Sequence, residues 1–158
     1  MSFSSKRILL GMGVGLVMLA AYFMRALGPA APAPDDIRAW ATLMLIFIGI
    51  SIVVMIVVQI LFHILYSIGI AIKERRQSDE KVERIISATV AEDERDKHIN
   101  LMAVRVGSRV FGMGVLLALV CLAAGASMLV ALHLILAACF LGSFAEGIAS
   151  VIYYEKGI

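Results

Sequence analysis

Long runs of apolar residues with almost no charge dominate the pattern along this chain. The run from Ala39 to Ile72 contains no Asp, Glu, Lys or Arg, and roughly 20 apolar residues already suffice to span a bilayer as a helix. A second apolar run covers Ile8 to Leu27. The last run, Val110 to Tyr154, holds a single acid, Glu146, and is too long for one membrane helix. The pattern therefore predicts an all-α integral membrane protein with four transmembrane helices, the last two joined by a turn within Ala124–Met128.

The second of these helices is longer than a bilayer needs. Its apolar part alone would measure about 51 Å, against a hydrocarbon core of roughly 30 Å. The helix must tilt strongly or leave the bilayer, and we favour the second alternative because apolar residues recur at helical spacing beyond Lys73, at Val82, Ile85, Ile86 and Val90. The expected helices cover residues 8–27, 37–72 with a cytoplasmic extension to 91, 94–125 and 129–154, with a cytoplasmic turn at 91–95.

The segment between the first two runs contains the residues that end one helix and begin the next. Three prolines between Gly28 and Asp36 prevent the first helix from continuing. Asp35 or Asp36 can cap the second helix. Trp40 lies one turn inside that helix, where an indole favours the membrane interface.

Charge is concentrated between Lys73 and Arg109, which we expect to form a helical hairpin extending the second and third helices. Nine Lys or Arg residues face eight Asp or Glu residues there. This near-neutral balance argues against direct nucleic-acid binding. A solvated amphipathic hairpin is the simplest interpretation. The alternative is a surface that binds a cytoplasmic protein, for which the candidates are Asp93, Glu94, Arg95 and Asp96.

Composition and the placement of basic residues indicate the compartment and the orientation. The chain is 61% hydrophobic, with a mean hydropathy of +0.96, which excludes an ordinary soluble domain. Twelve of the fourteen basic residues fall near the two termini or in the charged hairpin, while Arg25 and Arg38 flank the opposite loop. We therefore expect a multi-pass protein of the inner (plasma) membrane, with both termini cytoplasmic. The first apolar run fits a retained membrane helix better than a cleaved signal, because it is nearly a full span.

Glu146 is the candidate for a proton or ion site. It precedes Glu155 by nine residues, about 13 Å along a helix, and a carboxylate in hydrocarbon must be protonated, paired or in contact with water. His63 could share the site if the second helix leaves the bilayer near Lys73, and otherwise lies at the interface. Gln59 could join the site or form a structural hydrogen bond between helices. For Glu146 a neutral acid bonded between helices is the structural alternative.

The sequence gives no reason to expect an enzyme, a metal or a cofactor. His63 and His133 belong near opposite membrane faces, which argues against a haem shared between them. An enzyme acting on lipid would need a Ser/His/Asp set or a metal cluster, and neither pattern is apparent. Cys121 and Cys139 both lie in apolar runs and are expected to pack as small hydrophobic residues.

Small residues predict close helix packing, because they let helix backbones approach one another. The fourth helix is the richest in them and should be the packed centre, either within one subunit or in a homodimer or higher oligomer. The packing candidates are Gly11, Gly15, Gly114, Ala138, Gly142 and Gly147.

The third and fourth segments resemble a known family. Asp93-Glu94-Arg95, then Ile99, Ala103 and Gly107, followed by two spans and the ending Tyr153-Tyr154-Glu155-Lys156-Gly157, are similar to an uncharacterised prokaryotic family of small four-helix membrane proteins with a cytoplasmic DERxxxIxxxA signature. The resemblance implies no known activity. Some family members are encoded beside small helix-turn-helix regulators, which implies a membrane sensor or a sequestering partner.

Two functions follow as hypotheses. The first is a non-enzymatic, oligomeric sensor or adaptor in the lipid bilayer that binds a cytoplasmic protein through its charged hairpin. The alternative is a small proton- or cation-coupled transporter or channel that uses Glu146. Access of water to Glu146, for instance from a cavity between the second and fourth helices, would favour transport.

Overall fold

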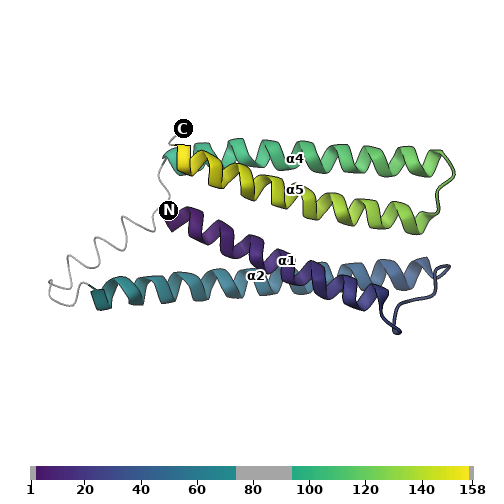
Figure 1. The fold of residues 1–158 in the computed structure, drawn as a ribbon, viewed down its shortest axis with the longest axis horizontal. Coiled ribbons are helices and arrows are strands. Elements are labelled where there is room, and N and C mark those ends of the chain that lie inside the picture. The colour runs from purple at the N-terminus through teal and green to yellow at the C-terminus, as the bar shows by residue number, and fades with distance from the viewer. Residues whose placement is uncertain (1–2, 74–93, 157–158) are drawn as a thin grey trace.

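The computed structural model describes residues 3–73 and 94–156, and these form four long α-helices. Figure 1 shows them, labelled α1 (Phe3–Leu27), α2 (Ile37–Lys73), α4 (Glu94–Ala123) and α5 (Met128–Lys156). Each is long and apolar enough to cross a membrane. The predicted all-helical class with four long apolar helices is therefore confirmed for the described part of the chain.

Helix boundaries differ most from the prediction where polar residues are helical. α1 begins at Phe3, before its apolar run, because Ser4 to Arg7 are compatible with a helix even though they are not hydrophobic. α5 likewise continues through Lys156. The expected cytoplasmic extension of α2 to residue 91, with Val82, Ile85, Ile86 and Val90, lies outside the described residues, as do Asp93 and most of the predicted turn.

Local hydrogen bonds and one glycine explain the two described connections. Asp36 Oδ1 accepts a hydrogen bond from the Ala39 amide at 2.9 Å, which caps the start of α2. Between α4 and α5, Gly125 has a φ of 91°, a left-handed conformation that glycine adopts without steric cost. This turn lies within the predicted break.

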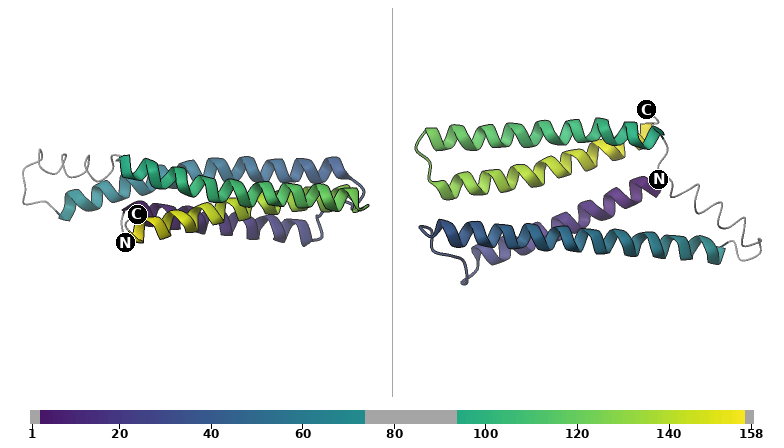
Figure 2. Two further views of the ribbon diagram at one scale, coloured as in Figure 1. Left: turned by 90° about the horizontal axis from the view of Figure 1, so that it is seen from above. Right: turned by 180° about the vertical axis from the view of Figure 1, so that it is seen from behind.

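The helices run nearly alongside one another, and the chain ends gather at one end of the bundle (Figures 1 and 2). We call the end with the starts of α1 and α4 and the ends of α2 and α5 the terminal end, and the opposite end the loop end. α5 contacts α4, α1 and α2, as its crowding of small residues predicts. α2 and α5 diverge toward the terminal end, where the first half of α1 lies between them (Figure 1).

α4 and α5 form the tightest pair, and glycines permit this approach. A methyl group on Gly107 would lie 2.8 Å from the Gly142 carbonyl oxygen, and one on Gly114 would come even closer to Ala138. Ile99 and Ala103 lie on the same face of α4 and are fully buried. Because real side-chain atoms do not approach so closely, only glycine fits at position 107 without moving a helix.

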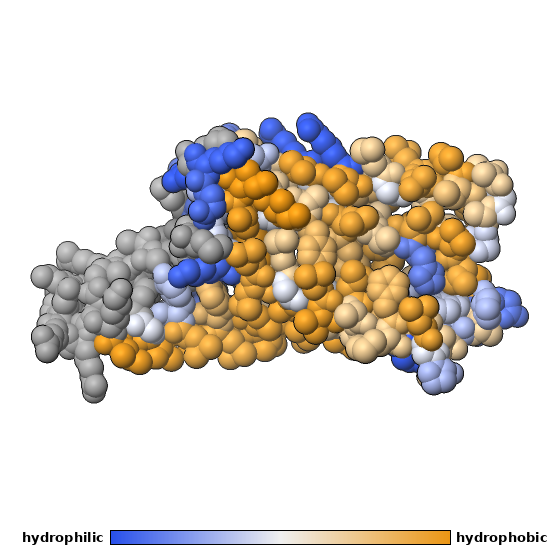
Figure 3. All heavy atoms as spheres, in the orientation of Figure 1, coloured by the Kyte–Doolittle hydropathy of each residue, from blue (hydrophilic) through white to orange (hydrophobic). Residues whose placement is uncertain are grey.

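The outer surface is largely hydrophobic. On the face seen in Figure 3, apolar residues cover most of the bundle, and hydrophilic residues gather toward its ends and on its upper edge. In α2, for example, most Ile, Leu and Val side chains are exposed, with relative accessibilities of 60% for Val53 and 67% for Leu65. Such large exposed apolar areas are not found on ordinary soluble monomers. Fold and surface together are those of a multi-pass helical membrane protein.

Candidate ligand cavity

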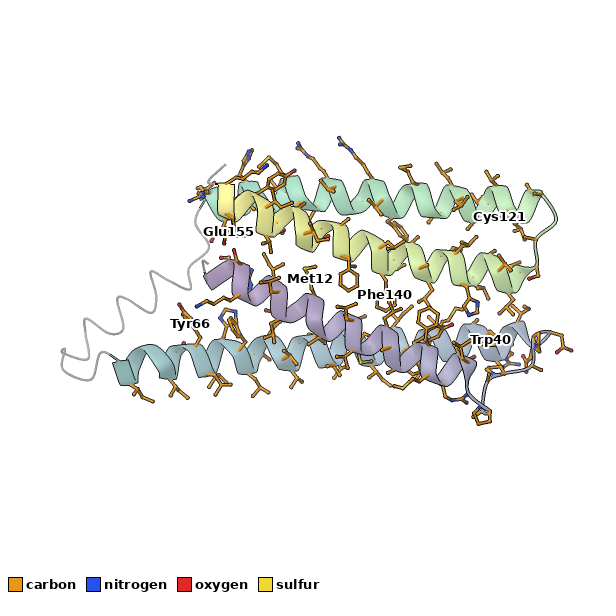
Figure 4. All side chains as sticks on the ribbon, viewed as in Figure 1. Met12, Trp40, Tyr66, Cys121, Phe140 and Glu155 are labelled. Atoms are coloured by element: carbon orange, nitrogen blue, oxygen red, sulfur yellow. The ribbon has the colours of Figure 1, made fainter. Side chains whose placement is uncertain are left out.

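A cavity of about 600 Å³ lies between α1, α2 and α5, and the start of α4 contributes to its terminal end. Met12 of α1 and Phe140 of α5 are on its walls and point toward the interior of the bundle (Figure 4). Most of the wall nearer the loop end is apolar and includes Ile48, Ile52 and Leu136. The cavity exists because α2 diverges from α5, so that their side chains do not fill the space.

Toward the terminal end the cavity wall becomes polar. The polar side chains there come from all four helices and are Arg7, Gln59, Asp96, Asn100, Glu146, Ser150 and Tyr154. The cavity is therefore amphiphilic along its length, with charge at one end and hydrocarbon and aromatic groups at the other.

Glu146 lies on this wall with its side chain half-buried. Gly107 on α4 leaves room for it, since a methyl group at Gly107 would lie 2.9 Å from Glu146 Cβ and 3.1 Å from Oε2. Within the part of the chain that the structure describes, no side chain forms a hydrogen bond or an ion pair with this carboxylate. The alternative in which Glu146 is a neutral acid hydrogen-bonded to another helix is thus not observed among these residues.

Gln59 shares the cavity with Glu146, whereas His63 does not. Gln59 Nε2 lies 3.9 Å from Met55 Sδ, and both residues face Gly11 of α1. His63 is one turn further along α2 and packs edge-on against Phe62, with ring centroids 6.3 Å apart. It is not on the cavity wall, and no hydrogen bond or ion pair joins it to Glu146. The structure therefore does not bring the His63–Glu146 pair together.

The candidate partner-binding residues at the start of α4 divide between two environments. Glu94 is exposed and pairs with Lys97 at 2.9 Å, and Arg95 is also exposed. Asp96 instead lines the cavity and accepts a hydrogen bond from the Tyr154 hydroxyl. Asp93 lies outside the described residues.

The predicted packing residues all lie at contacts between helices. Gly11 lies against Met55, Gly15 against Phe144 and Gly147 against Met12. Gly114, Ala138 and Gly142 lie within the α4–α5 contact described above.

A buried cluster joins three helices at the loop end. His133 Nδ1 lies 2.9 Å from the Leu129 carbonyl oxygen, so this nitrogen carries the proton and donates. Nε2 then accepts from the Tyr22 hydroxyl at 3.0 Å. Trp40 packs edge-on against the imidazole at 5.1 Å and donates its indole N–H to the Ala33 carbonyl. Tyr22, Trp40 and His133, which we call the loop-end cluster, connect α1, α2 and α5.

Sequence reasoning identified Glu146 and Gln59 but missed most of the cavity. Arg7 and Tyr154 gave no signal, because a basic or aromatic residue at a helix end is also typical of a membrane interface. Phe140 and Phe144 gave none because they lie within an apolar run, where the sequence does not distinguish a cavity wall from a packed or lipid-facing position. Comparison with family models, with curated proteins and with solved structures gave no match for this chain.

Proposed function

We propose that the protein is a non-enzymatic, small proton- or cation-coupled transporter or channel in which Glu146 binds the proton or cation. One observation carries the proposal. Glu146 is an acid without a hydrogen-bonding or ion-pair partner among the described side chains, and it lines the cavity beside its contact with Gly107. A carboxylate on the wall of such a cavity is a group that can hold a proton or a cation.

A simple placement of the bilayer supports this role. Measured at 1.5 Å per residue, about 27 to 33 Å of helix separates the loop ends of α1, α2, α4 and α5 from Arg7, Gln59, Arg105 and Glu146, respectively. The hydrocarbon core is roughly 30 Å thick. A bilayer that begins at the loop end would therefore reach its second boundary at the level of these four polar residues.

This placement moves Glu146 from the interior toward the membrane boundary. Counting from Glu155 would bury it about 13 Å deep, whereas here the last turns of α5 extend beyond the hydrocarbon together with the start of α4. Arg105, which is exposed on α4, then lies where arginines contact lipid headgroups. We infer that this side is cytoplasmic, that the membrane is the inner (plasma) membrane, and that Glu146 exchanges protons with cytoplasmic water.

Proton movement through the reconstituted protein tests this proposal. Proteoliposomes of phosphatidylethanolamine and phosphatidylglycerol, loaded with a pH-sensitive dye, should acidify under an imposed inward proton gradient. Glu146→Gln should abolish this movement, because an amide cannot take up the proton. Glu155→Gln is the matched control, since Glu155 is on the same helix but is bonded to Ser5 at 3.3 Å and is not on the cavity wall. Wild-type protein that moves neither protons, sodium nor potassium would refute the proposal.

An oligomeric sensor or adaptor is the second candidate, and one feature favours it. The first turns of α4 present Glu94, Arg95 and Lys97 outward, while Asp96 and Asn100 of the same turns reach the cavity. A ligand in the cavity would therefore touch the segment proposed to bind a cytoplasmic protein. In the resemblance, Ile99 and Ala103 would then be the structural part of the signature, since both are buried, as is Gly107 beyond it.

A pull-down from cytoplasmic extract separates this candidate from the first. A specific soluble partner should be retained by the wild-type protein and lost when Asp93, Glu94 and Arg95 are replaced together by alanine. Arg105→Ala is the control, because Arg105 is exposed on α4 but distant from its first turn. The same set of bound proteins for both variants would argue against an adaptor.

A further inference from the structure

We infer that the cavity binds a lipophilic organic cation, a molecule with a single positive centre attached to an apolar body. The inference names the ligand class of the site proposed above and rests on Glu146 acting there as the cation-binding group. It depends on the size of the cavity, its charge and the chemistry of its walls.

The size indicates an organic ligand. At about 600 Å³, the cavity falls within the roughly 300 to 1,000 Å³ typical of sites for small organic molecules. An inorganic cation at Glu146 would occupy only the polar end. The apolar wall formed by Ile48, Ile52 and Leu136 would then have no occupant to cover it. An apolar body extending from Glu146 toward the loop end would bury that wall.

The charge indicates a cation. Among the described residues, Arg7, Asp96 and Glu146 are the charged side chains that line the cavity, and one base against two acids leaves one negative charge in excess. Asp96 already accepts the Tyr154 hydroxyl. Glu146 is the acid whose carboxylate has no partner among the described residues, so a monovalent cation is the complement that the site lacks.

The walls favour an organic cation over a metal ion. A hard cation such as Ca²⁺ needs six to eight oxygen ligands, and among the described residues there is no group of three or more His, Cys, Asp or Glu side chains that could hold a metal ion. Phe140 and Phe144 instead bring aromatic rings to the cavity, and aromatic faces attract organic cations. Met12 and Met55 line the same space, and their flexible thioethers adapt to ligands of different shape.

The same chemistry could come from two sources. A free lipophilic amine in the membrane has an ammonium group on an apolar chain. An ethanolamine phospholipid of the surrounding bilayer also has an ammonium group and apolar chains, but a phosphate joins them and makes its net charge zero. Both would place the ammonium group at Glu146 and the apolar part along α2 and α5.

Binding of radiolabelled tetraphenylphosphonium to the purified full-length protein in dodecylmaltoside tests the inference. Binding should be saturable, and Glu146→Gln should weaken it by at least about tenfold, the change expected for one lost charge interaction. Ile52→Trp should also weaken binding, because Ile52 lines the apolar part of the cavity. Ile50→Trp should not, since Ile50 is a similarly exposed residue of α2 outside the cavity.

Competition identifies the source. Displacement by both dodecylammonium and phosphatidylethanolamine, but not by phosphatidylglycerol, would assign the site to the lipid, and displacement by dodecylammonium alone would assign it to free amines. Absence of saturable binding, or equal binding by wild type and Glu146→Gln, would overturn the inference. Glu146-dependent proton movement without cation binding would leave the transport proposal in place and refute only the ligand class. Cation binding without any ion movement would support the ligand class and refute the transport proposal.

Discussion

At Gly107 the backbone of α4 comes so close to α5 that a single methyl group would meet both the Gly142 carbonyl oxygen and the Glu146 side chain. This glycine therefore sets the spacing of two helices and leaves room for the carboxylate that faces the cavity. Packing and function are coupled at this one position, which a sequence pattern of small residues cannot reveal by itself.

Gly107→Val should consequently destabilise the α4–α5 pair by about 1 to 3 kcal/mol, the usual range for overpacking a tight contact. The measurement is the midpoint of thermal unfolding of the detergent-solubilised protein. Gly112→Val is the matched control, because a side chain on Gly112 would meet no atom within 4 Å. Equal midpoints for the two variants would show that the close approach at Gly107 is not present in solution.

At the residue scale, the sequence draws attention to Glu146 and Gln59, which line the cavity, but it does not give the face of the helix on which each lies. A polar residue within an apolar run is conspicuous, so Glu146 and Gln59 could be identified from the printed sequence. Counting along a helix gives depth, however, and not the face on which a side chain lies. His63 is one turn beyond Gln59 yet lies outside the cavity, and this depends on how α2 is rotated against its neighbours.

At the scale of the helices, the sequence could not predict that α1 packs against α5. The apolar runs located the four helices well, because each run is long and hydrophobic enough to span a membrane as a helix. Which helices pair depends instead on the detailed shape of their faces. Met12 lies against Gly147, its sulfur 2.8 Å from where a methyl group on that glycine would stand, so α1 packs on α5 within the chain.

A cysteine pair tests that contact. In a background with Cys121 and Cys139 replaced by alanine, Met12→Cys with Gly147→Cys should form a disulfide within one chain on mild oxidation, since the two positions are adjacent. Met12→Cys with Ile148→Cys should not, because Ile148 is exposed and is not among the residues on the cavity wall. Migration on a non-reducing gel distinguishes the products. A cross-linked dimer in place of a compact monomer would mean that α1 packs on α5 of another subunit.

For the whole molecule, the gathering of both chain ends at one end of the bundle has a direct consequence for topology. Ser5 donates a hydrogen bond to Glu155, which joins the first turn of α1 to the last turn of α5. Figure 4 shows Glu155 at the terminal end and Trp40 near the loop end. If the four helices cross a bilayer, residues near both ends of the chain must lie on one side of it.

Cysteine accessibility in intact cells tests this arrangement. In the cysteine-free background, Ala33→Cys in the exposed loop before α2 should react with a membrane-impermeant maleimide from outside. Lys156→Cys, which is also exposed, should react only after the cells are permeabilised. Mass spectrometry of the labelled protein gives the measurement. If only Lys156→Cys reacted in intact cells, the inferred orientation would be reversed. If both cysteines reacted in intact cells, the predicted placement of these two positions on opposite sides of the membrane would be wrong.

The loop-end cluster also limits how the bundle can change shape. Tyr22, Trp40 and His133 fasten α1, α2 and α5 together at one extremity, while α2 stands away from α5 at the other (Figure 1). Because α2 is held near its loop end, a rotation about this point displaces an α2 residue further the more distant it is from Trp40. A small rotation of α2 about Trp40 would thus leave the apolar wall near Leu136 almost unchanged and move Gln59 the most among the α2 residues of the cavity. The polar end of the cavity beside Glu146 would widen first.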